Sequence, residues 1–257
     1  MTNAVVLAGG TDSGELAAQT GVAHRPLLEV GGRPIIQRVL AALRGAVEVD
    51  RVALVAPEPV QAAAPAEAVD ARVASGESFV ENVRLGIEAA AEGADRVLLL
   101  TGDLPLITPA AVNDFVGQSA LAHAEVTYPI IPRESCERAF PGAARTYVKL
   151  REGAFTGGNG VVVDPAFVGL RAELIERLYA SRKHPLKLSA LFGYRFVLRL
   201  AMGRLDLERL QRRASEIVGG RVAAIISPYP ELGFDVDKMA DLNLARQAAE
   251  SFRLDQG

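Results

Sequence analysis

The fold of this chain is decided by the stretch Val5-Val6-Leu7-Ala8-Gly9-Gly10-Thr11-Asp12-Ser13-Gly14-Glu15, in which an apolar run stops at two glycines. Such a run is typical of a central parallel strand that is buried on both faces. The small residues after it allow backbone N–H groups to face a phosphate or a base. Two common glycine motifs are absent, because Thr11 stands where the dinucleotide fingerprint needs Gly and Glu15 stands where the P-loop needs Lys. By itself, the turn is explained equally well as a tight connection that binds nothing.

Two further apolar runs have the same form as the first. They are Arg51–Val55 and Arg96–Thr101, and between them Glu77–Ala91 carries apolar residues at helical spacing. Strand, helix and strand in alternation indicate βαβ units, which place ligand loops at the carboxyl ends of the strands. We therefore predict an α/β fold with a mostly parallel sheet and helices on both faces. The segments expected to converge on one edge of this sheet are 9–32, 75–78 and 102–105.

The remaining elements are predicted from apolar periodicity and helix-capping residues. The expected helices are 35–43, 109–122 behind Thr108 as N-cap, and 238–252, and the expected strands are 145–150, 160–163 and 221–226. Residues 165–218 are expected to form a mostly helical insertion, and residues 61–68 a surface loop or weak helix. We expect a single domain over residues 1–257, since α/β folds reach this length as one unit.

The composition limits the classes of function. Of 257 residues, 49% are hydrophobic and 23% are charged, and the net charge is −3. This apolar content supports a large core, and the negative charge argues against nonspecific binding to nucleic acid. The N-terminus lacks the basic start and long apolar region of a signal peptide, and Cys136, the only cysteine, cannot form an intrachain disulfide. We therefore expect a cytoplasmic protein.

An apolar stretch, Leu188–Met202, contains Arg195 and Arg199 and is too short and too charged to span a membrane. Core packing is the simplest explanation for it. A cover over the substrate site, a contact in a homodimer and a helix on a membrane surface are the alternatives.

The second informative segment is His24-Arg25-Pro26-Leu27-Leu28-Glu29-Val30-Gly31-Gly32-Arg33-Pro34-Ile35-Ile36. After Leu-Ala-Gly-Gly, this order of a basic residue, Pro-Leu-Leu and Gly-Gly-Arg-Pro resembles the opening signature of the MobA-like NTP transferases. The resemblance implies a Rossmann-like fold of the nucleotide-diphospho-sugar transferase type. It also implies that the glycine turn wraps a nucleotide and that Arg25 binds the nucleotide's phosphates.

Two features depart from the family pattern. The basic position is usually Lys, and Arg25 keeps the charge but offers a planar fork instead of a point charge. The loop from Thr11 to His24 is longer than usual and lacks the common Arg-Met-Gly element. The sequence therefore leaves open which residues touch the α-phosphate.

The expected nucleotide-binding residues come from the glycine turn, the basic position, the segment before the helix at 77–91 and the end of the strand at 96–101. They are Leu7, Ala8, Gly9, Gly10, Thr11, Arg25, Ser75, Gly76, Glu77, Asn82 and Gly102. In related enzymes the segment from Ser75 onward contacts the base or the ribose. Helix capping by Ser75 or Glu77 explains the segment equally well.

A carboxylate follows a buried strand in Leu100-Thr101-Gly102-Asp103-Leu104-Pro105-Leu106, which resembles the family's Gly-Asp-x-Pro metal site. Mg²⁺ prefers one or two carboxylates with phosphate oxygens and water, which suits a lone Asp at a strand end. An Asp that only caps the turn before Pro105 is the alternative. We predict Asp103 as a catalytic residue and a ligand of a Mg²⁺ cofactor.

Near the end of the chain, Asp235, Asp237 and Asp241 resemble the family's closing Asp-x-Asp-x-x-x-Asp-Leu pattern. The resemblance implies a second metal ligand here, and Asp235 is the first choice. Asp235 and Asp237 would share one face of a regular strand. Asp237 is expected to be the N-cap of the last helix instead.

Residues in the middle of the chain are candidates for binding the acceptor. Arg145 and Lys149 would lie on one face of the strand 145–150, and Gly157-Gly158-Asn159 would allow close approach and hydrogen bonding. A solvated basic edge strand explains the pattern equally well. The predicted acceptor-binding residues are Arg145, Lys149, Gly158, Asn159 and Lys183.

These residues predict a Mg²⁺-dependent nucleotidyltransferase of the EC 2.7.7 type, in which the phosphate of a small acceptor attacks the α-phosphate of an NTP and pyrophosphate leaves. The reaction needs positioning and charge neutralisation, for which Arg25, Asp103 and Lys149 are the catalytic candidates. A nucleotide-sugar glycosyltransferase is the alternative, because Asp235-Val236-Asp237 satisfies its Asp-x-Asp metal pattern. A catalytically idle nucleotide-binding protein of the same fold is the third hypothesis.

Overall fold

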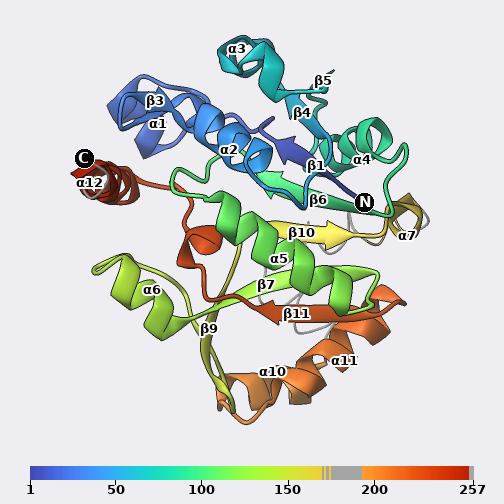
Figure 1. Ribbon diagram of the computed structural model, residues 1–257. Helices are drawn as coiled ribbons and strands as arrows, with labels where there is room; N and C mark the ends of the chain where they lie inside the picture. Colours follow the sequence, from blue (N-terminus) through green and yellow to red (C-terminus); the bar gives the residue numbers. More distant parts are fainter. Residues whose placement is uncertain (170, 172–173, 175–192, 255–257) are drawn as a thin grey trace.

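The computed structural model describes residues 1–169, 171, 174 and 193–254. Nine described strands form one mixed sheet, in the order β5-β4-β1-β6-β10-β7-β9-β8, with β11 paired to β7 (Figure 1). Their bounds are β1 Thr2–Leu7, β4 Val52–Ala56, β5 Ala71–Ala74, β6 Arg96–Thr101, β7 Val126–Pro132, β8 Val148–Leu150, β9 Gly153–Gly157, β10 Gly160–Val163 and β11 Val222–Ile226. The mostly parallel α/β sheet is confirmed.

The N-terminal half of the sheet is parallel and buried. β1 lies between β4 and β6, so that Leu7 is beside Val55 on one side and Thr101 on the other. Because side chains alternate along a strand, Val6 packs into the core on one face and Val5 into the core on the other. The continuous apolar runs of the sequence are thus explained by burial on both faces.

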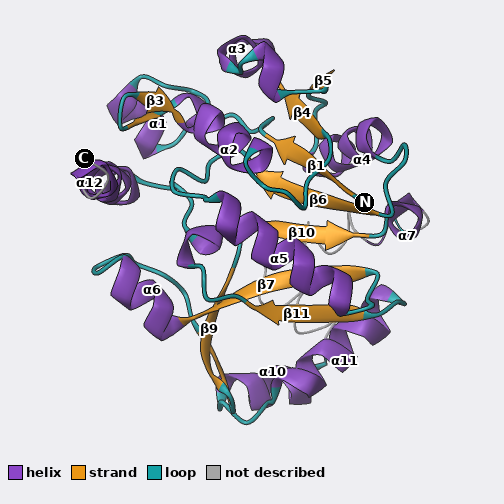
Figure 2. Cartoon of the chain, in the orientation of Figure 1, coloured by secondary structure: helices purple, strands orange, loops and turns teal. Residues whose placement is uncertain are grey.

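Helices cover both faces of this half (Figure 2). On one face lie α2 (Ile35–Arg44), α5 (Pro109–Leu121) and α12 (Met239–Leu254), and on the other lies α4 (Phe79–Ala90). α4 approaches the sheet closely at Gly86, where an added Cβ would stand 2.4 Å from a Val5 methyl group. The predicted helices are confirmed, and Thr108 caps α5 by accepting a hydrogen bond from Ala111 N.

The second half of the sheet mixes strand directions. β10 is antiparallel to both β6 and β7, and the β8–β9 hairpin extends the sheet beyond β7. β11 runs parallel to β7, and α11 (Leu207–Val218) lies along its free edge. There the N–H groups of Val222 and Ala224 donate to side-chain oxygens of Ser215 and Gln211, at 3.0 and 2.7 Å. These bonds satisfy donors that an edge strand would otherwise expose.

Several elements differ from the sequence-based expectations. The strand expected at 145–150 begins only at Val148. Residues 61–68 agree with the expectation of a surface loop or weak helix, since they contain the end of α3 (Glu58–Ala63) and a 3₁₀ turn. The strands β5, β7 and β9 and the helix α6 (Arg133–Ala139) were not predicted. The other described elements are α1 Glu15–Thr20, η1 Arg25–Leu27, β2 Glu29–Val30, β3 Arg33–Pro34, η2 Ala66–Ala68, α6 Arg133–Ala139, α7 Pro165–Gly169, α10 Tyr194–Ala201 and η3 Pro230–Gly233.

The described part of the 165–218 segment is largely helical, with α7, α10 and α11. Phe196 and Leu200 of α10 pack against Leu150, Phe155 and Leu205, whereas Leu198 and Met202 are exposed. Residues 188–192 of the apolar stretch lie outside the described residues. Among the described residues, no helix is long and apolar enough to cross a membrane. A homodimer contact stays a prediction.

Candidate functional site

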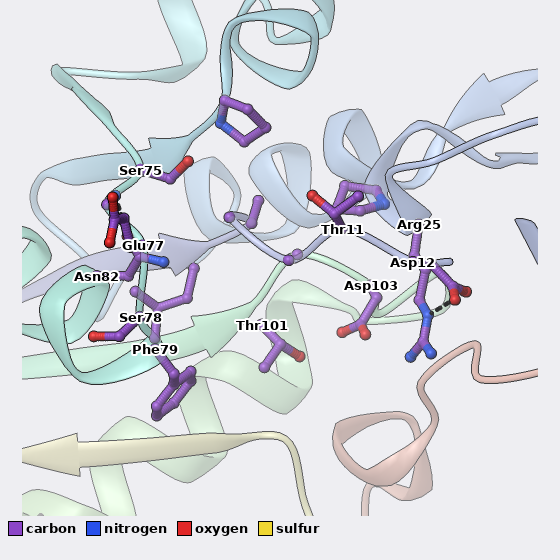
Figure 3. Close-up of a pocket in the computed structure, with 18 residues that line it drawn as sticks. Thr11, Asp12, Arg25, Ser75, Glu77, Ser78, Phe79, Asn82, Thr101 and Asp103 are labelled. Carbon is purple, nitrogen blue, oxygen red and sulfur yellow. Dashed lines mark hydrogen bonds and ion pairs between the residues drawn. The ribbon is translucent and has the colours of Figure 1, made fainter. Parts of the chain in front are cut away.

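A cleft of about 770 Å³ opens where β1, β5 and β6 end (Figure 3). Its walls are the glycine turn after β1, the segment between β5 and α4, and the turn after β6. It is lined by Leu7, Ala8, Gly9, Gly10, Thr11, Asp12, Arg25, Pro26, Pro57, Ser75, Gly76, Glu77, Ser78, Phe79, Asn82, Thr101, Gly102 and Asp103. All the residues predicted to bind the nucleotide line this cleft.

At Gly9 the glycine turn contacts Ser75, in the segment between β5 and α4, and Asn82 of α4. A Cβ added to Gly9 would stand 2.7 Å from Asn82 Nδ2 and 2.8 Å from Ser75 Cβ, so a side chain has no room there. Asn82 Oδ1 in turn accepts a hydrogen bond from Gly76 N at 2.7 Å. Gly10, by contrast, has nothing within 4 Å of an added Cβ. The turn therefore closes one wall of the cleft at Gly9 and leaves space beside Gly10.

The N-cap of α4 is Ser78, not Ser75 or Glu77 as the sequence suggested. Ser78 Oγ accepts from Glu81 N at 3.1 Å, and Glu81 Oε2 accepts from Glu77 N at 2.8 Å. Ser78 thus satisfies an N–H group of the helix's first turn, and Glu81 satisfies one of the preceding loop. Ser75 and Glu77 are left as parts of the cleft wall.

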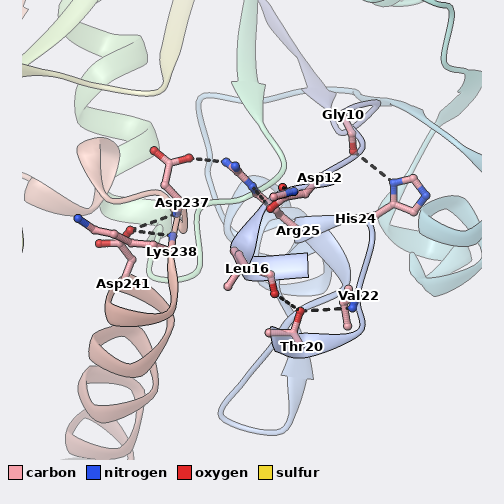
Figure 4. Close-up of polar contacts among 11 residues, drawn as sticks. Gly10, Asp12, Leu16, Thr20, Val22, His24, Arg25, Asp237, Lys238 and Asp241 are labelled. Atoms are coloured by element: carbon pink, nitrogen blue, oxygen red, sulfur yellow. Dashed lines mark hydrogen bonds and ion pairs between the residues drawn. The ribbon is translucent and has the colours of Figure 1, made fainter. Parts of the chain in front are cut away.

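Arg25 lies at the opposite end of the cleft from Ser75, Glu77 and Asn82 (Figure 3). Its guanidinium is held between two carboxylates, Asp12 and Asp237 (Figure 4). Asp12 was not singled out from the sequence, although its spacing to Gly14 is that of a side chain capping its own turn. The basic side chain expected from the sequence, Arg25, is therefore present in the cleft, and its two ion pairs are with Asp12 and Asp237.

Asp103 stands beside Arg25 with one carboxylate oxygen unsatisfied. Asp103 Oδ1 is buried and accepts no hydrogen bond from the described residues. Burial is the main cause that raises the pKa of Asp103 to about 6; the neighbouring Thr101 hydroxyl acts against this rise, and the negative charge of Asp235 acts with it. A buried acceptor without a partner is uncommon in native proteins and points to a missing donor or cation.

The closing segment, residues 234–237, contacts Asp103 by a hydrogen bond between the two backbones. Val236 N donates to the Asp103 carbonyl at 3.3 Å, which brings Asp235 and Asp237 to the site. The segment is not a strand, since residues 234–237 have no regular structure. Asp237 is not the N-cap of α12, because its carboxylate pairs with Arg25, whereas Asp241 Oδ2 accepts from the N–H groups of Asp237 and Lys238.

Asp235 is paired with Arg145. Arg145 Nη1 lies 2.5 Å from Asp235 Oδ1, and its guanidinium carbon lies 4.9 Å from the centre of the Phe234 ring. Arg145 precedes β8, so it does not share a strand face with Lys149 as the sequence suggested. Arg145 thus contacts Asp235, a pairing that the sequence did not predict.

None of the described acceptor candidates, Arg145 included, lines the cleft. Lys149 is exposed on β8, which β9, β7 and β10 separate from β6. Gly158 is buried, and an added Cβ would meet Pro129 and the Leu232 carbonyl, so its lack of a side chain serves packing. Asn159 is fixed by its backbone, with its N–H on the Leu232 carbonyl and its carbonyl accepting from Thr101 N. Lys183 lies outside the described residues.

Metal-binding residues are few in this region. Among the residues that the structure describes, no group of three or more His, Cys, Asp or Glu side chains could hold a metal ion. The cleft offers Asp103, with Asp235 near enough to raise its pKa. Two carboxylates completed by phosphate oxygens and water are a set that suits Mg²⁺. The residues present therefore fit this ion.

Comparisons with known proteins agree with this geometry. The family model for the MobA-like NTP transferase domain matches residues 4–216. A structure from Thermus thermophilus described as a hypothetical transferase is 36% identical, with a TM-score of 0.83 and coverage of 94% of this chain and 100% of that chain. No curated protein matches the chain in sequence.

Two more distant structures share the fold alone. A nucleotidyl transferase from Methanothermobacter is 19% identical, with a TM-score of 0.61 over 98% of this chain and 99% of that chain. A CMP:2-keto-3-deoxy-manno-octonic acid synthetase complexed with CTP is 18% identical, with a TM-score of 0.64 over 98% of this chain and 99% of that chain. The family match over most of the chain carries the assignment: the chain belongs to the MobA-like NTP transferase family.

Proposed function

We propose that this protein is a nucleotidyltransferase that transfers an NMP group from an NTP to a small phosphorylated acceptor and releases pyrophosphate. The observation that carries the proposal is the cleft itself, which combines a glycine turn, an arginine and a carboxylate with one buried, unpaired oxygen. The proposal is further supported by family membership and by the fold shared with a synthetase that was solved with CTP.

The nucleotide has space beside Gly10, and its phosphates would meet Arg25 at the end of the cleft where Asp103 stands. The other end, formed by Ser75, Glu77 and Asn82, offers polar groups for the base or the ribose. Positioning of this kind supplies much of the catalysis in reactions of phosphate esters.

Asp103 and Asp235 would hold Mg²⁺ in our proposal. When bound, the ion neutralises charge that develops on the phosphate oxygens. Its binding would also give the orphaned Asp103 Oδ1 a partner and offset the repulsion between the two carboxylates.

For the acceptor, Arg145 is our candidate, and its ion pair with Asp235, beside the proposed metal site, supports this choice. An oxygen of the acceptor phosphate forms a bond to the α-phosphorus, and the bond from that phosphorus to the bridging oxygen of the β-phosphate breaks. The electron pair leaves with pyrophosphate, so no protein nucleophile is needed.

We place this reaction in the cytoplasm, because a chain with a single, buried cysteine does not need an oxidising environment to form disulfides.

The test is pyrophosphate release from each of the four NTPs with Mg²⁺ and a panel of phosphorylated sugars, alcohols and cofactors. We expect one NTP to be turned over with at least one acceptor. Transfer or hydrolysis of a UDP- or GDP-sugar without pyrophosphate release would contradict the proposal and favour a glycosyltransferase. Failure of every NTP with every acceptor would also count against it.

A further inference from the structure

The guanidinium of Arg25 contacts its two carboxylates through different edges. Nε donates to Asp12 Oδ2 at 3.1 Å, whereas Nη1 is paired with Asp237 Oδ1. The Asp12 side chain is 10% exposed and that of Asp237 is 60% exposed. One partner is thus built into the fold and the other stands in solvent.

Asp12 is fixed by several bonds besides the one to Arg25. Its Oδ1 accepts from Gly14 N at 2.8 Å, and its own N–H donates to the Ala23 carbonyl at 2.8 Å. The Gly14 N–H and Arg25 together hold the pKa of Asp12 below its ordinary value, so the carboxylate is ionised at neutral pH. Asp12 therefore ties the glycine turn to the segment that carries Arg25 (Figure 4).

We propose that Asp12 is a positioning residue, which holds the Nε edge of Arg25 so that its Nη groups stay available to the phosphates of a nucleotide, and that Asp237 is the carboxylate those phosphates displace. This inference rests on the function proposed above.

The reason lies in the residue type at position 25. A lysine ammonium is a point charge with no preferred edge, whereas an arginine fork must be oriented before it can hold two phosphate oxygens. An ionised partner on Nε supplies this orientation. The long loop from Thr11 to His24 supplies Asp12 for this contact with Arg25. The Asp12–Ala23 and His24–Gly10 hydrogen bonds join the two ends of the loop and so bring Asp12 close to Arg25.

The two carboxylates then have opposite effects on phosphate binding. Asp12→Asn keeps an oxygen for Gly14 N but removes the charge that orients Arg25, so we expect about tenfold weaker binding of Mg-NTP. Asp237→Asn removes a competitor for Nη1, so we expect binding about threefold tighter. If the two carboxylates served folding alone, the two substitutions would not change the affinity for Mg-NTP in opposite directions.

The experiment is calorimetric titration of the full-length protein with each of the four NTPs, and with inorganic tripolyphosphate as a probe without a base, all in the presence of Mg²⁺. The variants are Asp12→Asn, Asp237→Asn, Arg25→Lys and the double variant that combines Asp12→Asn with Arg25→Lys, with thermal melting of each unliganded variant as a check of the fold. Because lysine has no Nε edge, we expect Asp12→Asn to change the dissociation constant of the Arg25→Lys variant by less than about twofold.

An equal loss of affinity from Asp12→Asn in the wild-type background and in the Arg25→Lys background would overturn the positioning role while leaving the proposed function intact. Weaker binding by Asp237→Asn would overturn the displacement. If wild type bound neither an NTP nor tripolyphosphate, the proposed function would fail, and this inference with it.

Discussion

In the half of the sheet formed by β5, β4, β1 and β6, the candidate residues follow strands that run in the same direction and end at one edge. In the half formed by β10, β7, β9, β8 and β11, strand directions are mixed. Its candidates are spread over the β8–β9 hairpin, the residues on either side of this hairpin and the segment 234–237. The first half gathers its residues into one cleft, and the second contributes Arg145, Asp235 and Asp237 beside it.

The difference explains why the predicted nucleotide-binding residues lie together in one cleft and the predicted acceptor-binding residues do not. Parallel βαβ units place every strand end at the same edge, so sequence order is enough to group the loops. An antiparallel hairpin carries neighbouring residues away from that edge, as it does for Lys149. We expect substitutions to follow this division, with the largest effects in the cleft and the smallest on the hairpin.

Replacement of Asp103 should have the largest effect. Asp103→Asn keeps the size of the side chain and removes the proposed metal ligand, so we expect turnover to fall by about 1,000-fold. Pyrophosphate release at saturating Mg²⁺ is the measurement. The melting temperature of the unliganded variant should be equal to or higher than that of wild type, because a buried charge with one unpaired oxygen is removed. Full activity of the variant would show that Asp103 only caps its turn.

Replacement of Arg145 tests whether the second half of the sheet serves the acceptor. Arg145→Ala removes a charged donor, so we expect KM for the acceptor to rise by about 30-fold while KM for the NTP changes little. Steady-state kinetics with both substrates varied will separate the two constants. A selective rise in the KM of the NTP would assign Arg145 to the nucleotide instead.

The pH dependence should report the Asp103 carboxyl. Its pKa is about 6 in the folded protein and 3.8 ordinarily, so the folded state binds this proton more tightly. The stability of the unliganded protein should therefore fall as pH rises from about 4 to 6. Mg²⁺ competes with the same proton, so its affinity should fall about tenfold from pH 7 to pH 5. Melting curves with and without Mg-NTP measure both trends, and Asp103→Asn should remove them.

Replacement of Lys149 should have the smallest effect. Lys149→Ala changes an exposed side chain on the hairpin, so we expect turnover and both KM values within about twofold of wild type. Assays run beside Arg145→Ala give the matched comparison. A loss of tenfold or more would mean that the hairpin reaches the substrates.

The sequence predicted the cleft well because its signals are local. Buried apolar runs mark the strands, and glycines or a carboxylate directly after them mark the loops, as at Gly9 and Asp103. The contact of Gly9 with Asn82 and the capping of α4 by Ser78 depend on the approach of two loops, which periodicity does not describe.

The pairing of charges was the least predictable part. Alternation along an assumed strand placed Arg145 with Lys149, whereas the structure places it with Asp235, far away in sequence. Likewise, Asp237 looked like a helix cap from its position, but Asp241 supplies the hydrogen bonds and leaves Asp237 for Arg25. Long-range ion pairs follow from tertiary packing, which local patterns do not encode.

Above all, we propose that the cleft binds an NTP with a divalent ion held by Asp103 and Asp235. The most direct measurement is anomalous scattering from crystals grown with Mn²⁺ and a non-hydrolysable NTP analogue. We predict a manganese peak bonded to both carboxylates and to phosphate oxygens, with Asp235 released from Arg145. A peak bonded to neither carboxylate, with the nucleotide bound outside the cleft, would contradict the account.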